Sequence, residues 1–181
     1  MRVIGGKVRG TKLDSLEGII TRPTLDRIKE SMFNIIQKKI EDSYVLDLFS
    51  GSGALAIETL SRGAKEAILC DKSKDAIKII KKNIEKTHFE NKVTIINKDY
   101  LKCLDDINKK FDIIFLDPPY DSNFAENAIK IIIKKELLSK DGIIIFETDK
   151  NDISNIEKLD INIYDLRKYG RVKLVFLNRK E

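Results

Sequence analysis

The sequence predicts an α/β fold built on a doubly wound, mostly parallel β-sheet. Short apolar runs alternate with segments whose apolar residues recur every three or four positions, as in buried strands joined by amphipathic helices. The last two apolar runs are separated by only a few residues, which favours a hairpin that adds an antiparallel strand. The length of 181 residues, without an internal repeat or a linker, favours one compact domain.

Seven strands are expected in this sheet, at residues 44–49, 67–70, 93–96, 111–116, 143–146, 161–166 and 172–177. Helices are expected at residues 54–62, 73–84 and 124–135, the first closed by Gly63 and the second capped by Ser73. We expect Asp141-Gly142 to form the turn that introduces the fifth strand, and residues 168–171 to form the loop of the final hairpin.

A basic extension, residues 1–40, is expected to precede the core of residues 41–181. Glycines punctuate residues 1–20 and predict hairpin-like structure, and apolar residues at helical spacing predict a helix from Thr24 to Lys39. The extension holds nine Lys or Arg and four Asp or Glu, so it carries the whole net charge of +5. Such asymmetry favours an arm that contacts nucleic acid, although a solvated lysine-rich surface would also explain it.

The remaining composition favours a soluble cytoplasmic protein. Cys70 and Cys103 lack metal-ligand spacing and are expected to be reduced and structural, as in a cytosolic chain. No signal-like region occurs at the N-terminus, and no run approaches the ~18 apolar residues of a membrane span. His88, the only histidine, is expected in an exposed loop, and no metal is expected.

A glycine loop follows the first predicted strand, in the run Asp47-Leu-Phe-Ser50-Gly51-Ser-Gly53. Gly51 and Gly53 let the backbone approach a ligand closely, and the next helix points its positive N-terminus at that ligand. The spacing also satisfies the dinucleotide fingerprint, so it does not exclude a nicotinamide enzyme. Asp47 favours S-adenosylmethionine instead, because an acid binds the cationic groups of that cofactor but would repel a pyrophosphate.

Two further acids lie at the ends of predicted strands. Asp71 ends the second strand, where a carboxylate can accept hydrogen bonds from ribose hydroxyls. Asp99 takes a similar position after the third strand. Both are therefore candidate cofactor ligands.

The tetrapeptide Asp117-Pro118-Pro119-Tyr120 closes the fourth predicted strand, beside the crevice in which open α/β sheets bind ligands. The prolines lack N–H groups and hold the backbone stiff, so their carbonyls and Asp117 offer rigid acceptors. Two acceptors on the hydrogens of a base amine favour its attack on a methyl donor, and Asp117 stabilises the developing charge. Tyr120 can stack on the base.

Three segments together identify a family resemblance. These are TRPTLDRIKESMFN (residues 21–34), DLFSGSGALAIETLSRGA (residues 47–64) and DPPY, and they closely resemble the RsmD family of bacterial small-subunit ribosomal RNA guanine-N2 methyltransferases. The opening MRVIGGKVRGTKL and the late KYGRVKLVF match the ends of that family, so the resemblance covers essentially the whole chain. The glycine and DPPY motifs are shared with other amino-methylating enzymes, whereas the RPT-DR-KE segment is more specific.

The resemblance implies a Rossmann-like class I methyltransferase that moves a methyl group from S-adenosylmethionine to N2 of one guanine in 16S rRNA. Carried over by position, the methionine end of the cofactor would contact Asp47, Ser50, Gly51 and Gly53. Asp71 would hold the ribose and Asp99 the adenine side. The target amine would meet residues 117–120, with Asp117 also beside the cofactor.

RNA contacts are expected mainly in the extension. The candidates are Arg2, Lys7, Arg9, Arg22, Arg27 and Tyr169, of which the last lies in the final hairpin loop and could simply turn the chain. Arg22 and Arg27 could instead form salt bridges with acids at the start of their helix. The family resemblance implies that the segment from Arg22 to Arg27 closes over the site. The expected partner is 16S rRNA, in the small subunit or an assembly intermediate, and a monomer is expected.

Three alternatives remain open at this point. A DNA adenine-N6 methyltransferase shares the motifs, but 181 residues leave no room for a sizeable target-recognition domain. A nicotinamide oxidoreductase would use the glycine loop, and calorimetric titration with NAD would detect it. A non-enzymatic RNA-binding protein on the same fold would leave Asp117 without a purpose.

Overall fold

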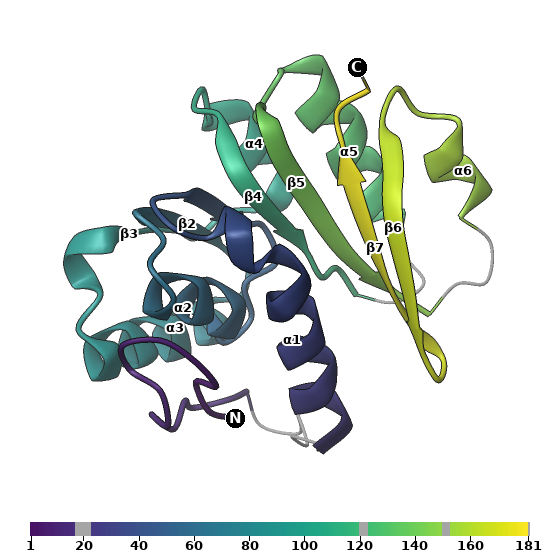
Figure 1. The fold of residues 1–181 in the computed structure, drawn as a ribbon. Helices are drawn as coiled ribbons and strands as arrows, with labels where there is room; N and C mark the ends of the chain where they lie inside the picture. Colours follow the sequence, from purple (N-terminus) through teal and green to yellow (C-terminus); the bar gives the residue numbers. More distant parts are fainter. Residues whose placement is uncertain (17–22, 120–122, 150–152, 181) are drawn as a thin grey trace.

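A single seven-stranded sheet organises the molecule, in the order β3-β2-β1-β4-β5-β7-β6 (Figure 1). The structure, a computed structural model, describes residues 1–16, 23–119, 123–149 and 153–180. The strands are β1 Tyr44–Asp47, β2 Glu66–Cys70, β3 Val93–Ile96, β4 Phe111–Leu116, β5 Leu138–Thr148, β6 Asn162–Tyr169 and β7 Val172–Asn178. The pairs among β1 to β5 are parallel, and β7 is antiparallel to both β5 and β6. The predicted fold class is confirmed.

Helices cover both faces of the sheet (Figure 1). They are α1 Pro23–Ile36, α2 Ala54–Ser61, α3 Lys74–Thr87, α4 Tyr100–Asp106, α5 Phe124–Lys134 and α6 Ser154–Glu157, with short 3-10 helices at Gln37–Lys39 and Glu90–Lys92. One core lies between the sheet and α1, α2 and α3, and a second lies between the sheet and α4, α5 and α6. The inner strands β1, β4 and β7 are buried on both faces, which explains their largely apolar sequences, whereas the edge strands β3 and β6 are partly exposed.

The β5 prediction was wrong at its start, because Asp141-Gly142 is not a turn. The strand begins at Leu138 and runs through both residues, with a register shift opposite Phe111 and Ile113. A Cβ atom on Gly142 would lie 2.8 Å from Leu138 Cδ1 and 2.9 Å from the Phe111 carbonyl oxygen. The glycine therefore permits close approach of strands at an irregularity, which a sequence pattern does not distinguish from a turn.

The final hairpin and two helices also differ from expectation. β6 extends to Tyr169, so the turn is only Gly170-Arg171, with Gly170 at φ +63°. The sequence analysis did not predict α4 or the short α6. Asp99 begins α4 as its N-cap, accepting a hydrogen bond from the Leu101 N–H at 3.0 Å, and this cap is the signal that could have revealed the helix.

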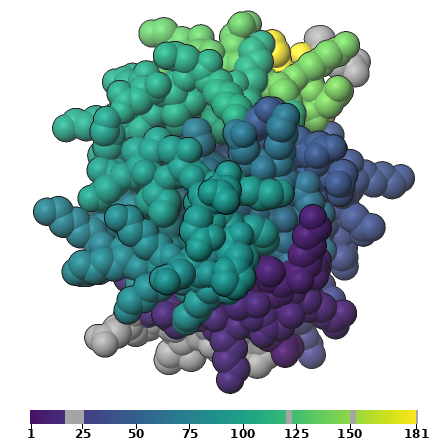
Figure 2. Space-filling model, turned by 90° about the vertical axis from the view of Figure 1, so that its left-hand side faces the viewer, coloured from purple at the N-terminus to yellow at the C-terminus, as the bar shows by residue number. Residues whose placement is uncertain are grey.

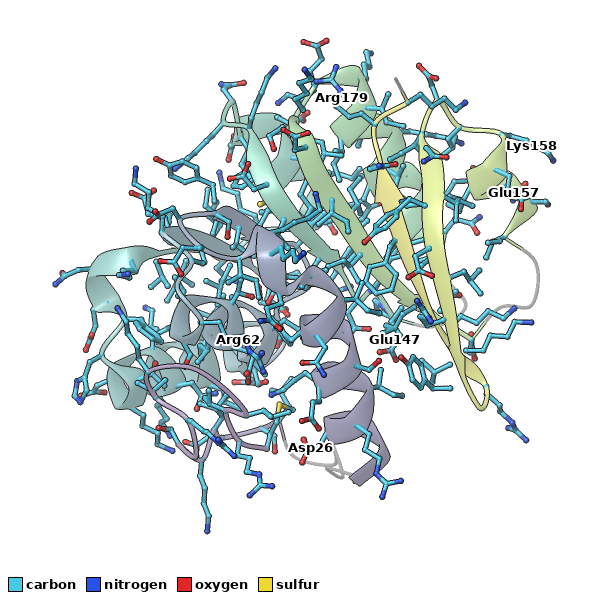
Figure 3. The ribbon with its side chains drawn as sticks, viewed as in Figure 1. Asp26, Arg62, Glu147, Glu157, Lys158 and Arg179 are labelled. Atoms are coloured by element: carbon cyan, nitrogen blue, oxygen red, sulfur yellow. The ribbon has the colours of Figure 1, made fainter. Side chains whose placement is uncertain are left out.

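The N-terminal extension is fastened to the core by Glu58 of α2, whose side chain is completely buried. Its carboxylate accepts the N–H groups of Ile4 and Gly5, both at 2.8 Å, and pairs with Arg62 at 2.8 Å and with Lys29 of α1 at 3.3 Å. Figure 3 shows Arg62 beside α2, facing the extension. A buried carboxylate with four donors joins the loop, α1 and α2 into one unit.

Residues 1–16 form a loop closed by one antiparallel bridge, Arg2 to Lys12, rather than a long hairpin. Figure 2 shows this loop, in purple, on the surface of the molecule. Asn83 of α3 holds its far end: the side chain accepts the Asp14 N–H at 2.8 Å and donates to the carbonyls of Asp14 and Ser52, both at 2.9 Å. The loop is thereby tied to the glycine loop.

The two cysteines and the histidine at position 88 lie in the surroundings that the sequence predicts. Cys70 and Cys103 are buried and free, and His88 is exposed just past α3, as predicted. None of the helices that the structure describes is long and apolar enough to cross a membrane.

Candidate active site

A cavity of about 580 Å³ opens at the carboxyl ends of the parallel strands. Its size is within the range of small-molecule sites, and its place is where open α/β sheets bind ligands. Most predicted site residues that the structure describes line it, namely Asp47, Ser50, Gly51, Asp71, Asp99, Asp117, Pro118 and Pro119. Tyr120 lies outside the described residues.

Asp47 is the most unusual group in the cavity. It ends β1, only 1% of it is exposed, and neither carboxylate oxygen has a hydrogen-bond partner among the residues that the structure describes. Burial, followed by the negative charge of Asp117, raises its pKa to about 8. The Ala56 N–H opposes this shift but falls short of hydrogen-bond geometry. An unpartnered buried carboxyl fits a cationic ligand group.

The glycine loop leaves space for a ligand at one glycine only. Gly51 has φ +55°, and an added Cβ would meet no atom within 4 Å. Gly53 has φ +78°, but its Cβ would lie 3.0 Å from Leu69 Cδ2, and it does not line the cavity. The Ser50 hydroxyl is turned inward and donates to the Asp47 carbonyl at 2.6 Å. Gly53 and Ser50 shape the loop, whereas Gly51 faces the open space.

Asp71 connects the loop to the end of β2. Its Oδ2 accepts the Gly51 N–H at 2.9 Å, and its Oδ1 accepts the Ser73 N–H at 2.8 Å. Each oxygen keeps a second lone pair directed at possible ligands. Asp71 can therefore orient the loop and still accept hydroxyl hydrogens.

Three aromatic rings form a wall beside Asp99. Ring centroids lie 5.3 Å apart for Phe49 and Tyr100, 5.1 Å for Tyr100 and Phe124, and 6.3 Å for the stacked pair of Phe49 and Phe124. All three rings line the cavity. The sequence analysis did not connect them, because they come from three separate segments of the chain.

Asp117 lies just past β4, the strand that pairs with β1. It is exposed to the cavity, yet protein atoms surround the carboxyl, so desolvation raises its pKa to about 7 with help from the charge of Glu147. The negative charge of Asp117 in turn raises the pKa of Asp47. Pro118 is buried and Pro119 exposed, and both line the cavity.

Glu147 near the end of β5 is a cavity residue that the sequence analysis missed. The same reasoning that identified Asp71 and Asp117, a carboxylate at the carboxyl end of a central strand, would have found it. Figure 3 shows Glu147 at the end of β5, beside α1.

Helix α1 forms the remaining wall. Asp26, Ile28, Lys29 and Met32 line the cavity, and Figure 3 shows Asp26 in the first turn of this helix. Ser31 bonds to the hydroxyl of Tyr169, which is half-buried at the end of β6. The Tyr169 hydroxyl therefore joins the C-terminal hairpin to α1.

The other predicted RNA contacts lie at the surface. Arg2, Lys7, Arg9 and Arg27 are exposed, and no ion pair holds Arg27 among the residues that the structure describes. Arg22 lies outside the described residues. Arg2 and Arg27 follow Met1 and Asp26 in the chain, two residues that line the cavity.

Comparison with known proteins identifies relatives along almost the entire chain. The family model described as conserved hypothetical protein 95 matches residues 1–178. The ribosomal RNA small subunit methyltransferase D of Haemophilus influenzae is 37% identical over 83% of this chain and 80% of its own length. That of Escherichia coli is 32% identical over 82% of this chain and 75% of its own length.

Solved structures agree with the sequence comparison. The yhhF protein of Escherichia coli superimposes with a TM-score of 0.87 at 29% identity, covering 99% of this chain and 98% of that one. A Haemophilus influenzae protein described as a putative methylase superimposes with a TM-score of 0.82 at 32% identity, covering 99% of this chain and 98% of that one. The chain therefore belongs to the conserved hypothetical 95, or RsmD, family of Rossmann-like methyltransferases.

Proposed function

We propose that the protein transfers a methyl group from S-adenosylmethionine to the exocyclic N2 of a guanine in 16S ribosomal RNA. Relatives named ribosomal RNA small subunit methyltransferase D support ribosomal RNA as the substrate. The family resemblance of the motifs supports N2 of a guanine of the 966 type as the target. The observation that carries the proposal is the cavity that joins unpartnered Asp47 to Asp117.

The charges of the cavity favour this cofactor over a nicotinamide dinucleotide. Asp47, Asp71 and Asp117 are close enough that the latter two raise the pKa of the first. Such a cluster attracts the ammonium and sulfonium of S-adenosylmethionine and repels a pyrophosphate. The ammonium group would meet Asp47, the ribose Asp71, and the adenine Asp99 and the aromatic wall. When bound, the cofactor supplies a methyl group on a positively charged sulfur.

Asp117 and the stiff Pro118-Pro119 backbone would act on the target amine. A carboxylate and a carbonyl that accept its two hydrogens hold the amine in place and direct its lone pair toward the methyl donor. As the N–C bond forms, the nitrogen gains positive charge, which Asp117 stabilises. The amine must finally lose one proton, and a carboxyl with a pKa of about 7 can accept it near neutral pH.

The extension is the proposed RNA contact. The exposed Arg2, Lys7, Arg9 and Arg27 would bind phosphates, and Arg22 would add to them. Guanine N2 is paired in a duplex, so the base must be unpaired or extruded to reach Asp117. The substrate would be the small ribosomal subunit or an assembly intermediate, which fits a cytoplasmic protein.

Methyl transfer to purified small ribosomal subunits tests the proposal. Labelled methyl groups from S-adenosylmethionine should appear in 16S rRNA, and digestion should release N2-methylguanosine. Asp117→Ala should lower kcat about 100- to 1000-fold, because it removes a charged acceptor at the reacting nitrogen. Asp75→Ala, at an exposed acid of α3, is the matched control and should leave the rate unchanged. N6-methyladenosine as the product, or full activity of Asp117→Ala, would refute the proposal.

A further inference from the structure

Asp117 and Glu147 occupy matching positions on neighbouring parallel strands. The register pairs Phe115 with Ile145 and Leu116 with Phe146, so the next residues along are Asp117 and Glu147. Neighbouring strands are about 4.8 Å apart, which brings the two carboxylates close together. Both line the cavity, and the charge of Glu147 acts on Asp117. The cavity thus presents two adjacent acidic acceptors from different strands.

Apolar side chains form much of the wall on this side of the cavity, together with Asp26 and Lys29 of α1. Ile145 and Glu147 share one face of β5, and with Ile28, Met32 and Leu174 they line the part of the cavity under α1. A flat ring packed against these side chains would present its polar edge to the two carboxylates. The fully buried, unpartnered Asp47 in the same cavity indicates independently that the cavity is built for a ligand.

We propose that Glu147 reads the target base, by accepting the ring N1–H of guanine while Asp117 accepts a hydrogen of the neighbouring exocyclic amine. This inference rests on the proposed function and adds to it the residue that selects the base. The Watson–Crick edge of guanine carries N–H donors at both positions, so two carboxylates match it. Glu147 is held in a strand, paired with Leu174 of β7, which suits a group that must keep its position.

The same pair of acceptors rejects other bases. Adenine and cytosine also carry an exocyclic amine, but the adjacent ring nitrogen has a lone pair instead of a hydrogen. Glu147 would then place a carboxylate oxygen against that lone pair, and such a repulsive mismatch is costly in an enclosed site. Base selection is thereby assigned to β5 and methyl-acceptor activation to β4.

2-Aminopurine separates these two roles. It keeps the exocyclic amine at position 2 but has no hydrogen on N1, so Asp117 can still hold its amine while Glu147 meets a lone pair. The assay uses small subunits reconstituted with guanosine or 2-aminopurine riboside at the position that the wild-type protein methylates. The wild type should prefer guanine by about 100-fold in kcat/KM.

Glu147→Gln is the decisive variant, because its side chain has the same shape and its amide N–H can donate to the N1 lone pair of 2-aminopurine. We expect the guanine preference to fall by about 10- to 100-fold, mainly through a higher rate on 2-aminopurine. Glu147→Ala should lose activity on guanine without the gain on 2-aminopurine. Glu157→Gln, the same change at an exposed residue of α6 labelled in Figure 3, should keep the wild-type preference.

Titration with S-adenosylhomocysteine on the same preparations reports whether the cavity of each variant is folded. If Glu147→Gln binds this ligand normally but loses guanine and 2-aminopurine activity equally, Glu147 does not read N1 and the inference is wrong. A wild-type protein that methylates no guanine would instead overturn the proposed function. The two failures are therefore distinguishable.

Discussion

The two halves of the cavity are built in different ways. The half over β1 and β2 is held by local bonds: Asp71 accepts the N–H groups of Gly51 and Ser73, and Ser50 bonds back to the Asp47 carbonyl. The half over β4 and β5 is closed by distant parts of the chain, since α1 forms its outer wall. The proposed cofactor half is thus preorganised by neighbouring residues, whereas the proposed base half depends on long-range docking.

Glu58→Ala should break the base half and has the largest expected effect. The change leaves Lys29, Arg62 and two backbone N–H groups without their buried acceptor. The free energy of unfolding, measured by urea denaturation, should fall by about 3 to 5 kcal/mol. Methylation of subunits should fall far more than affinity for S-adenosylhomocysteine. Glu85→Ala on the exposed face of α3 is the control. If Glu58→Ala lowers methylation and S-adenosylhomocysteine affinity equally, the two halves are not built separately.

Asp47→Asn should break the cofactor half instead. Affinity for S-adenosylmethionine should fall about 100-fold or more in calorimetric titration, because a buried carboxylate loses its charge opposite the ligand ammonium. Binding of small-subunit RNA should change little, since the extension is untouched. Asp75→Asn is the matched surface control. Normal cofactor affinity in Asp47→Asn would show that this carboxyl does not hold the ammonium.

The stability of the ligand-free protein should depend on pH through Asp47. Its pKa rises from 3.8 to about 8 on folding, so the folded state favours the protonated form. The contribution of the protonated Asp47 carboxyl to folding stability is therefore complete below pH 4 and is lost as pH rises through about 8. As pH rises from 5 to 9, the free energy of unfolding of Asp47→Asn should increase by about 1 to 3 kcal/mol relative to that of wild type. Denaturation curves of both proteins across this range measure the difference, and a constant difference would contradict the shift.

Tyr169→Phe should have the smallest effect. It removes the hydroxyl that hydrogen-bonds to Ser31 but keeps the ring packed against the core. We therefore expect the free energy of unfolding to fall by about 0.5 to 1.5 kcal/mol. RNA binding should be unchanged if this hydroxyl only joins the hairpin to α1. Tyr164→Phe on the exposed side of β6 is the control for stability. A large drop in RNA affinity for Tyr169→Phe alone would identify this residue as an RNA contact after all.

The cofactor half was largely predictable from the sequence, whereas the base half was predictable only in part. Asp47, Gly51, Asp71 and Asp99 follow strands at their carboxyl ends, and parallel strands bring such ends to one edge. The DPPY motif was recognisable for the same reason. Glu147 also follows an apolar run at the carboxyl end of a strand, but it was missed because it belongs to none of the recognised motifs.

The errors in the fold have similar physical causes. Asp141-Gly142 has the composition of a turn, but it lies at an irregularity within β5, where the glycine permits close contact with Phe111 and Leu138. The helix α4 is short, and Asp99 was interpreted as a ligand although it also serves as an N-cap. For Asp141-Gly142, composition does not distinguish a turn from a strand irregularity, and only the packing of neighbouring strands decides between them.

The sequence by itself determined the succession of the strands and of the longer helices, the family motifs and the edge of the sheet at which Asp47, Asp71 and Asp117 gather. These follow from hydrophobic periodicity and from the geometry of parallel sheets, which are local or nearly local properties. Only the tertiary structure decided that Asp47 is buried with no hydrogen-bond partner in the described part of the chain, that Glu147 lies near Asp117, and that Glu58 fastens the extension to the core. Burial and contact between distant residues depend on packing of the whole chain, which no short stretch of sequence specifies.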